Sequence, residues 1–208
     1  MARYRGPKAK IARREGSNIF GLPKITRVLT KRNYPPGIHG PAQSIMRSKT
    51  TEYGTQLREK QKMKRTYGLT EKQFRNSYIK ATNKEGDAGF NLHSSLETRL
   101  DNVVYRLGLA ASRAQARQMV SHTLVQVNGK KVNIPSYQVK AGEEISIRDK
   151  SKDSPLFDEI KEGNNKAEVP TWLSATPKNL SGKVVSQPKE KDLEGQFDLK
   201  VIIEFYSR

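Results

Sequence analysis

The chain has 208 residues and no cysteine, and its 39 Lys and Arg residues against 21 Asp and Glu residues give a formal net charge of +18. The composition excludes a disulfide framework, a thiolate zinc site and a cysteine nucleophile. So much positive charge opposes a compact state unless an anionic partner neutralises it, which favours a polyanion-binding protein over a neutral enzyme.

The positive charge is concentrated at the N-terminal end. Residues 1–80 hold 20 basic and 4 acidic side chains, whereas residues 81–208 hold 19 and 17. Within residues 1–50, Glu15 is the one acidic side chain, and Gly and Pro are frequent. We expect this part to be a basic, largely irregular extension that orders against nucleic acid and its neighbouring helices, because it contains apolar anchors such as Ile25. A disordered, solubilising tail is the alternative.

Local signals predict several helices in the first 90 residues. Lys8–Arg14 favours a short helix that ends before Gly16. The composition of residues 51–66 favours a helix, and a capping box at residues 70–73 opens another helix that runs to about Asn83. One buried stripe is predicted on the latter helix, formed by Phe74, Tyr78, Ile79 and Ala81. The Gly-rich residues 86–89 indicate a domain border. We therefore assign residues 51–90 to the helical part of a first domain, which helices from the C-terminal side of the chain complete.

The second domain is predicted over residues 91–208, with its core at about 97–150. Leucine and valine at helical spacing predict one continuous helix from Leu92 to Leu107, and a capping box at residues 112–115 opens a shorter helix. The period then changes to two on either side of Asn128-Gly129, which predicts a β-hairpin. Further strands are expected at residues 144–148 and 199–206, the second closing the sheet at the chain end. Residues 149–198 are expected to be loop-rich, with one short helix near residues 156–161. The fold class is α+β, with a mostly helical N-terminal domain and a helix-turn-helix/antiparallel-sheet module.

The strongest basic run lies in the helix predicted at residues 51–66. Arg58, Lys62 and Arg65 share one helix face because they are four and three residues apart, and Lys60 and Lys64 widen it. Only Glu59 offsets these five groups within the run, so internal salt bridges do not explain the pattern. We predict that this face follows a phosphate backbone; a solvated charged face is the alternative.

A second basic group lies in the helix-turn-helix-hairpin region. Arg113 and Arg117 are four residues apart and are predicted to face outward from the core, where each guanidinium can grip two phosphate oxygens. His122 and the hairpin-tip residues Lys130 and Lys131 are predicted nearby.

The sequence gives little support for catalysis or metal binding. The three histidines lack the spacing of a metal site, and no phosphate-binding glycine loop or serine elbow is present. No apolar run approaches the roughly 20 residues of a membrane-spanning helix, and the N-terminus lacks an apolar signal core. We expect a soluble intracellular protein with no cofactor, no metal and no enzymatic activity.

Several motifs resemble one known family. ETRLDNVVYRLG at residues 97–108, SRAQARQ at 112–118 and VQVNG at 125–129 resemble the S4 RNA-binding module. ARYRGP at residues 2–7, PGIHG at 36–40 and EFYS at 204–207 resemble the S4 family of small-subunit ribosomal proteins, so the similarity runs from end to end.

The resemblance implies a non-enzymatic rRNA-binding role. It implies a primary binder of 16S-type rRNA at a multi-helix junction, which nucleates assembly of the small subunit and contacts ribosomal protein S5. It also implies a position near the mRNA entry channel, where Arg47 and Lys49 follow the His-Gly pair. The expected location is the small ribosomal subunit in bacterial cytoplasm, or in an organelle, and no homo-oligomer is expected.

Two alternatives from other classes stay open at this point. The same module anchors RNA-modifying enzymes, although residues 149–208 are too few for a catalytic domain, and an autogenous translational repressor would bind its own message. The predicted RNA-binding residues are Arg3, Arg5, Lys8, Lys10, Arg13, Arg14, Arg58, Lys62, Arg65, Lys72, Arg75, Arg113, Arg117, His122, Asn128, Lys130 and Lys131.

Overall fold

The computed structural model describes residues 4–45, 51–161, 169–193 and 197–207. The chain divides into two compact units, one formed by Met1–Asn76 with Gly195–Arg208 and the other by Ser77–Glu194. None of the helices within the described ranges has the length and apolar character needed to cross a bilayer.

The first unit is helical. Its helices are α1 (Lys8–Glu15), α2 (Pro23–Lys31), α3 (Gly40–Ile45), α4 (Glu52–Thr66), the first part of α5 (Glu71–Thr82) and α12 (Leu199–Ser207). The helices predicted at residues 8–14, 51–66 and after the capping box are thereby confirmed.

Side-chain caps fix where these helices start. The Thr51 hydroxyl accepts a hydrogen bond from the Gly54 amide at 3.2 Å and caps α4. Before α5, the Thr70 amide donates to Gln73 Oε1 while the Gln73 amide donates to the Thr70 hydroxyl, so the predicted capping box forms in both directions. Along α5, Phe74 and Ala81 are buried, but Ile79 is 45% exposed. The prediction of a fully buried stripe is therefore wrong at Ile79.

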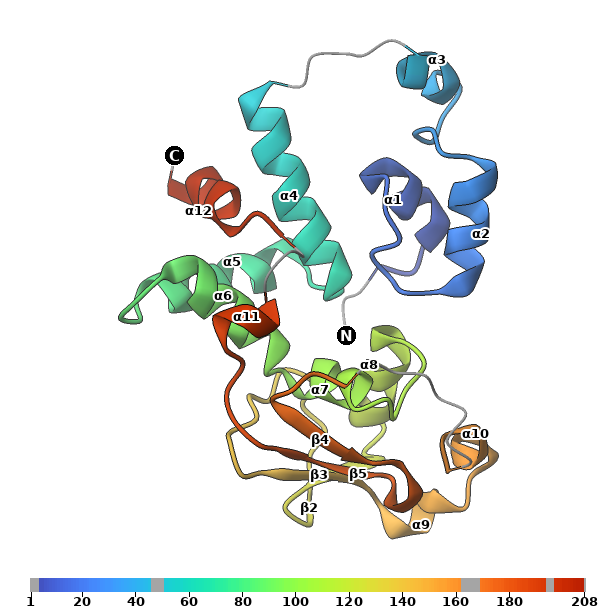
Figure 1. Ribbon diagram of the computed structural model, residues 1–208, viewed down its shortest axis with the longest axis vertical. Coiled ribbons are helices and arrows are strands. Elements are labelled where there is room, and N and C mark those ends of the chain that lie inside the picture. The colour runs from blue at the N-terminus through green and yellow to red at the C-terminus, as the bar shows by residue number, and fades with distance from the viewer. Residues whose placement is uncertain (1–3, 46–50, 162–168, 194–196, 208) are drawn as a thin grey trace. The chain divides into compact units, whose positions relative to one another are not determined.

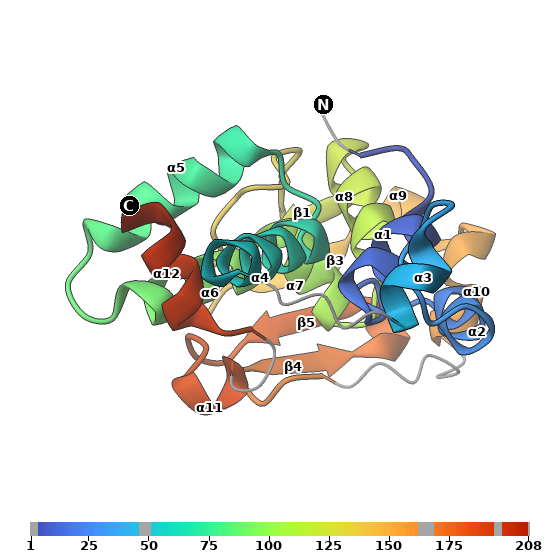
Figure 2. The same ribbon diagram turned by 90° about the horizontal axis from the view of Figure 1, so that it is seen from above.

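The last described residues form a helix rather than the predicted closing strand. α12 lies beside α4 in both views (Figures 1 and 2). Ile202 is completely buried, and the Phe205 ring lies 5.6 Å from the Tyr53 ring of α4. The run of β-branched and aromatic residues predicts a strand by propensity, but packing against α4 selects the helix.

The helices of the second unit are α6 (Ala88–Glu97), α7 (Leu100–Arg106) and α8 (Arg113–Ser121). The prediction of one continuous helix from Leu92 to Leu107 is wrong, because the chain breaks at Thr98 and Arg99. At the break, the Leu100 amide donates to the Tyr137 carbonyl at 2.8 Å and the Val139 amide donates to the Thr98 carbonyl at 2.9 Å. A distant loop therefore replaces the helical hydrogen bonds at this corner.

The sheet is antiparallel, with the strand order β2-β1-β3-β5-β4. The strands are β1 (Val125–Val127), β2 (Lys130–Lys131), β3 (Glu144–Ile147), β4 (Leu173–Thr176) and β5 (Ser181–Val184). Asn128 and Gly129 have φ of 48° and 75°, the conformation of the predicted hairpin turn. The strands β4 and β5 were not predicted, because residues 149–198 were expected to be loop-rich.

Short helical segments complete the second unit. They are α9 (Asp149–Lys152), η1 (Pro155–Phe157), α10 (Asp158–Lys161), η2 (Pro177–Asn179) and α11 (Glu190–Leu193). The short helix predicted near residues 156–161 corresponds to η1 and α10.

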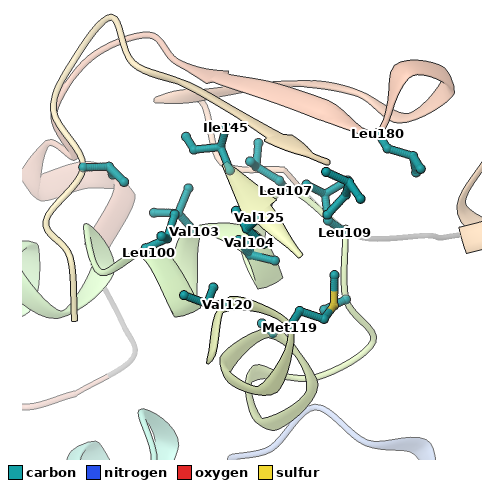
Figure 3. Close-up of a cluster of buried hydrophobic side chains, with 14 of the residues drawn as sticks. Leu100, Val103, Val104, Leu107, Leu109, Met119, Val120, Val125, Ile145 and Leu180 are labelled. Carbon is teal, nitrogen blue, oxygen red and sulfur yellow. The ribbon is translucent and has the colours of Figure 1, made fainter. Parts of the chain in front are cut away.

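The main core lies between α7, α8 and one face of the sheet (Figure 3). Leu100, Val103 and Val104 of α7 meet Val125 of β1 and Ile145 of β3, and all five are completely buried. This packing positions both helices over the strands (Figures 1 and 2).

One glycine shows how closely β5 approaches α7. A Cβ atom built on Gly182 meets the Leu107 side chain and lies 3.0 Å from the Ser174 carbonyl oxygen. Only a residue without a side chain fits there.

Candidate nucleic-acid interface

The basic residues of α4 are partly neutralised by carboxylates from other helices. Lys60 and Lys64 each place Nζ 2.7 Å from a different oxygen of Glu71, at the start of α5. Lys60 is 5% exposed, and its ammonium lies 4.4 Å from the centre of the Phe205 ring. These contacts make Lys60 part of the packing between α4, α5 and α12.

Glu15, at the end of α1, pairs with basic residues of α4 other than the two that Glu71 contacts. Its buried carboxylate contacts the guanidinium of Arg65 and lies 3.9 Å from that of Arg58, while Lys62 pairs with Glu59 at 3.5 Å. As predicted, ion pairs within the run do not explain it, because Glu59 pairs only with Lys62, and the other carboxylates, Glu15 and Glu71, come from α1 and α5. Glu15 lies far away in sequence, so its role was not visible in the run itself. Arg58 keeps 45% of its side chain exposed.

The contacts of Glu71 change its ionisation. Partial burial by itself raises the pKa of this carboxyl group, but hydrogen bonds from Lys60, Lys64 and Tyr206 lower it from 4.5 to about 2. Glu71 therefore stays ionised, and keeps both lysines paired, throughout the neutral range.

The N-terminal basic residues divide into exposed and structural groups. Arg5, Lys10 and Arg14 are exposed. Arg13 instead donates from Nε to the Tyr34 carbonyl at 3.0 Å and stacks over the Tyr34 ring. Lys8 is half-buried, 5.6 Å from the Phe20 ring. The predicted residues Arg3, Arg47 and Lys49 lie outside the described residues.

The structure contradicts the outward orientation predicted for Arg113 and Arg117. Arg117 is 6% exposed, with Nη1 3.5 Å from Asp101 Oδ2. Arg113 donates from Nε to Asn102 Oδ1 at 2.7 Å and lies over the Tyr105 ring. Because α8 turns this edge toward α7, both guanidinium groups take part in its packing.

Two buried carboxylates of the second unit each attract two arginines. Glu97 is 1% exposed and accepts two hydrogen bonds from Arg106, each at 2.9 Å, with Arg113 at 4.0 Å. Asp101 accepts two hydrogen bonds from Arg99 and also pairs with Arg117. These pairs join α6, α7 and α8 through charge-assisted hydrogen bonds.

His93 is completely buried next to this cluster. Burial lowers its pKa from 6.5 to about 4; the nearby Glu97 carboxylate acts in the opposite direction, while Arg106 and Arg113 lower it further. The imidazole is therefore neutral at physiological pH. Within the described ranges, no group of three or more His, Asp or Glu side chains is arranged to hold a metal ion.

The remaining predicted residues are exposed. Lys72 and Arg75 lie on α5, and His122, Lys130 and Lys131 lie on the turn and hairpin after α8. Asn128 Oδ1 accepts a hydrogen bond from the Glu144 amide at 2.9 Å, so that side chain also stabilises the hairpin turn.

A further set of exposed basic residues lies outside the predicted RNA-binding residues. The set lies on and next to α2 and consists of Lys24, Arg27, Lys31 and Arg32. The first three are spaced by three and four residues, which is a helical spacing inside a segment that its composition predicts to be largely irregular.

Comparisons with known proteins agree with the motifs. Residues 3–97 match the family described as ribosomal protein S4/S9 N-terminal domain, and residues 98–145 match the S4 domain. Proteins named small ribosomal subunit protein uS4 match over the full length of both chains, with 48% identity in Natranaerobius thermophilus and 49% in Parabacteroides distasonis. With this similarity over its whole length, the chain belongs to the uS4 family of small ribosomal subunit proteins.

Proposed function

We propose that this protein is a structural, non-enzymatic constituent of the small ribosomal subunit, in bacterial cytoplasm, and that it binds 16S-type rRNA. The observation that carries the proposal is the full-length similarity to uS4 proteins. The exposed basic residues on α1, α5 and the hairpin support it, because they provide charge for a phosphate backbone.

The proposed site of action is a junction of several rRNA helices. Crowded helices repel one another through their phosphates, and a basic protein at the junction offsets that repulsion and favours the folded RNA. Because the deep groove of A-form RNA hides the bases, recognition is mainly of shape and backbone. In this role the protein nucleates subunit assembly and contacts ribosomal protein S5, and Arg47 and Lys49 approach mRNA near its entry channel.

The test is filter binding of the full chain to a 16S-type rRNA fragment that contains the junction, with an uninterrupted RNA duplex of equal length as the control. If about 6–10 phosphates are engaged, affinity falls by about 10³–10⁵ between 50 and 200 mM salt, by analogy with duplex DNA. We expect the junction to bind more tightly than the duplex. Equal affinity for both RNAs, or an affinity independent of salt, would overturn the proposal.

A further inference from the structure

The polar side of α2 carries a regular row of positive charge. On a helix, residues three and four apart are neighbours, so Lys24, Arg27 and Lys31 form a single row about 10 Å long. All three are exposed, as is Arg32 directly after the helix. We call Lys24, Arg27 and Lys31 the α2 row; Arg32 is not part of it.

The opposite side of α2 fixes the direction in which the row points. Ile25 is 4% exposed, and α2 packs alongside α1 (Figure 1). Asn18 lies in the loop between α1 and α2. Its Nδ2 donates to the Leu22 carbonyl at 3.0 Å and to the Thr26 hydroxyl at 2.8 Å, which fixes this loop to the first turn of α2. The helix is therefore anchored to its neighbours, and the row is presented away from that anchored side.

The α2 row differs from α4 in its neutralisation. Glu59, Glu71 and Glu15 pair with the basic residues of α4. Among the ion pairs between described residues, none involves Lys24, Arg27 or Lys31. Since Glu15 is the one acidic residue in the first 50, the row has no acidic neighbour along its own segment.

We propose that the α2 row is a phosphate-binding surface for the rRNA backbone, and that it contributes more to binding than the prominent run on α4. The inference rests on the proposed function and adds a site to it. The physical reason is that an RNA phosphate at α4 competes with carboxylates already in place, whereas a phosphate at α2 displaces only solvent and counterions.

The experiment compares two triple variants of the full chain in filter binding to the junction fragment. One removes the row (Lys24→Gln, Arg27→Gln and Lys31→Gln). The control removes three exposed lysines of the second unit (Lys140→Gln, Lys150→Gln and Lys178→Gln), so both variants lose the same net charge. The plot of log affinity against log salt has a negative slope. Losing three phosphate contacts makes this slope shallower by about 2.7, by analogy with duplex DNA. Between 50 and 200 mM salt, the fold-loss of affinity is then roughly 40 times larger for the wild-type chain than for the α2 variant.

The outcomes separate this inference from the proposed function. A shallower salt dependence of affinity in the α2 variant, with a near wild-type salt dependence in the control, supports the inference. Equal slopes in the two variants overturn it but leave the rRNA-binding function standing. If the wild-type chain does not bind the junction in a salt-dependent way, the proposed function itself fails.

Two further measurements distinguish a lost contact from a disturbed fold. The charge-conserving variant Lys24→Arg, Arg27→Lys and Lys31→Arg is expected to keep the wild-type slope, and a reduced slope in it would contradict backbone binding. Because the chain has no cysteine, Thr30→Cys creates a unique exposed thiol beside the row. We expect the rRNA fragment to slow the reaction of the Thr30→Cys thiol with a maleimide several-fold, and to leave the reaction of a Lys150→Cys thiol unchanged. The same degree of slowing at both thiols would overturn the inference.

Discussion

Glu97 connects three helices of the second unit, although its position in the sequence gives no sign of this role. Its buried carboxylate accepts hydrogen bonds from Arg106 and Asn102 and lies close to Arg113, so it connects α6, α7 and α8. Replacing it leaves guanidinium groups in a poorly solvated site without their counter-charge.

We therefore expect Glu97→Gln to lower the free energy of unfolding by about 3–5 kcal/mol, measured by urea denaturation. The matched control is Glu144→Gln, because Glu144 is exposed and its replacement should change stability by less than about 0.5 kcal/mol. Similar values for the two variants would show that the cluster is not stabilising.

His93 predicts how stability depends on pH. In the unfolded chain the imidazole takes up a proton near pH 6.5, but in the folded protein only near pH 4, so the unfolded state binds more protons between these values. The free energy of unfolding should therefore fall as the pH is lowered from 6.5 towards 4. Thermal melting between pH 7 and pH 5 measures the effect, and His93→Gln should flatten the dependence in this interval. A slope that is unchanged in the variant would assign the dependence to other groups.

At the scale of elements, α12 gives the clearest test of packing over propensity. Ile202 is completely buried in the helix that lies on α4. Removing most of its side chain leaves a cavity, so Ile202→Ala should cost about 2–5 kcal/mol in thermal or urea unfolding. Lys200→Ala on the same helix is the control, because Lys200 is exposed. Equal stability of the two variants would contradict the docking of α12.

Elements with a local signal could be predicted from the sequence. The capping box at Thr70 and the Asn128-Gly129 turn are contained within four or fewer residues, and both form as predicted. The helix break at Thr98 and the helical state of α12 depend on residues about 40 or more positions away, and sequence patterns do not report such contacts.

The same distinction applies to the candidate site. Helical spacing correctly placed Arg58, Lys62 and Arg65 on one helix, but their partner Glu15 belongs to α1. Spacing also placed Arg113 and Arg117 together and gave no indication that Asn102 and Asp101 of α7 would bind them. Spacing thus identifies which charges lie together, whereas tertiary contacts decide which of them remain available to a ligand.

At the scale of the whole chain, the charge divides unevenly between the two units. The unit of residues 1–76 and 195–208 has 21 basic and 6 acidic residues, a net charge of +15, whereas residues 77–194 have 18 and 15, a net charge of +3. Self-repulsion therefore falls mainly on the helical unit, and a polyanion that binds it in the folded state will relieve that repulsion.

This asymmetry predicts that inorganic polyphosphate raises the melting temperature of the free protein. At 100 times its dissociation constant, a ligand that binds only the folded state stabilises it by about 2.7 kcal/mol. The increase should be large at 50 mM salt and nearly absent at 500 mM, because salt weakens the binding. An equal increase at both salt concentrations would contradict an electrostatic origin.

The corner at Thr98 has a consequence for the order of events during synthesis. Its hydrogen bonds require residues 137 and 139, which a ribosome adds only after residues 88–107 have been made. Until then, the periodicity of Leu92, Leu96 and Leu100 favours one uninterrupted helix. We therefore expect a nascent chain halted before residue 130 to favour a straight helix over this stretch, and to bend it only after residues 137 and 139 have been added.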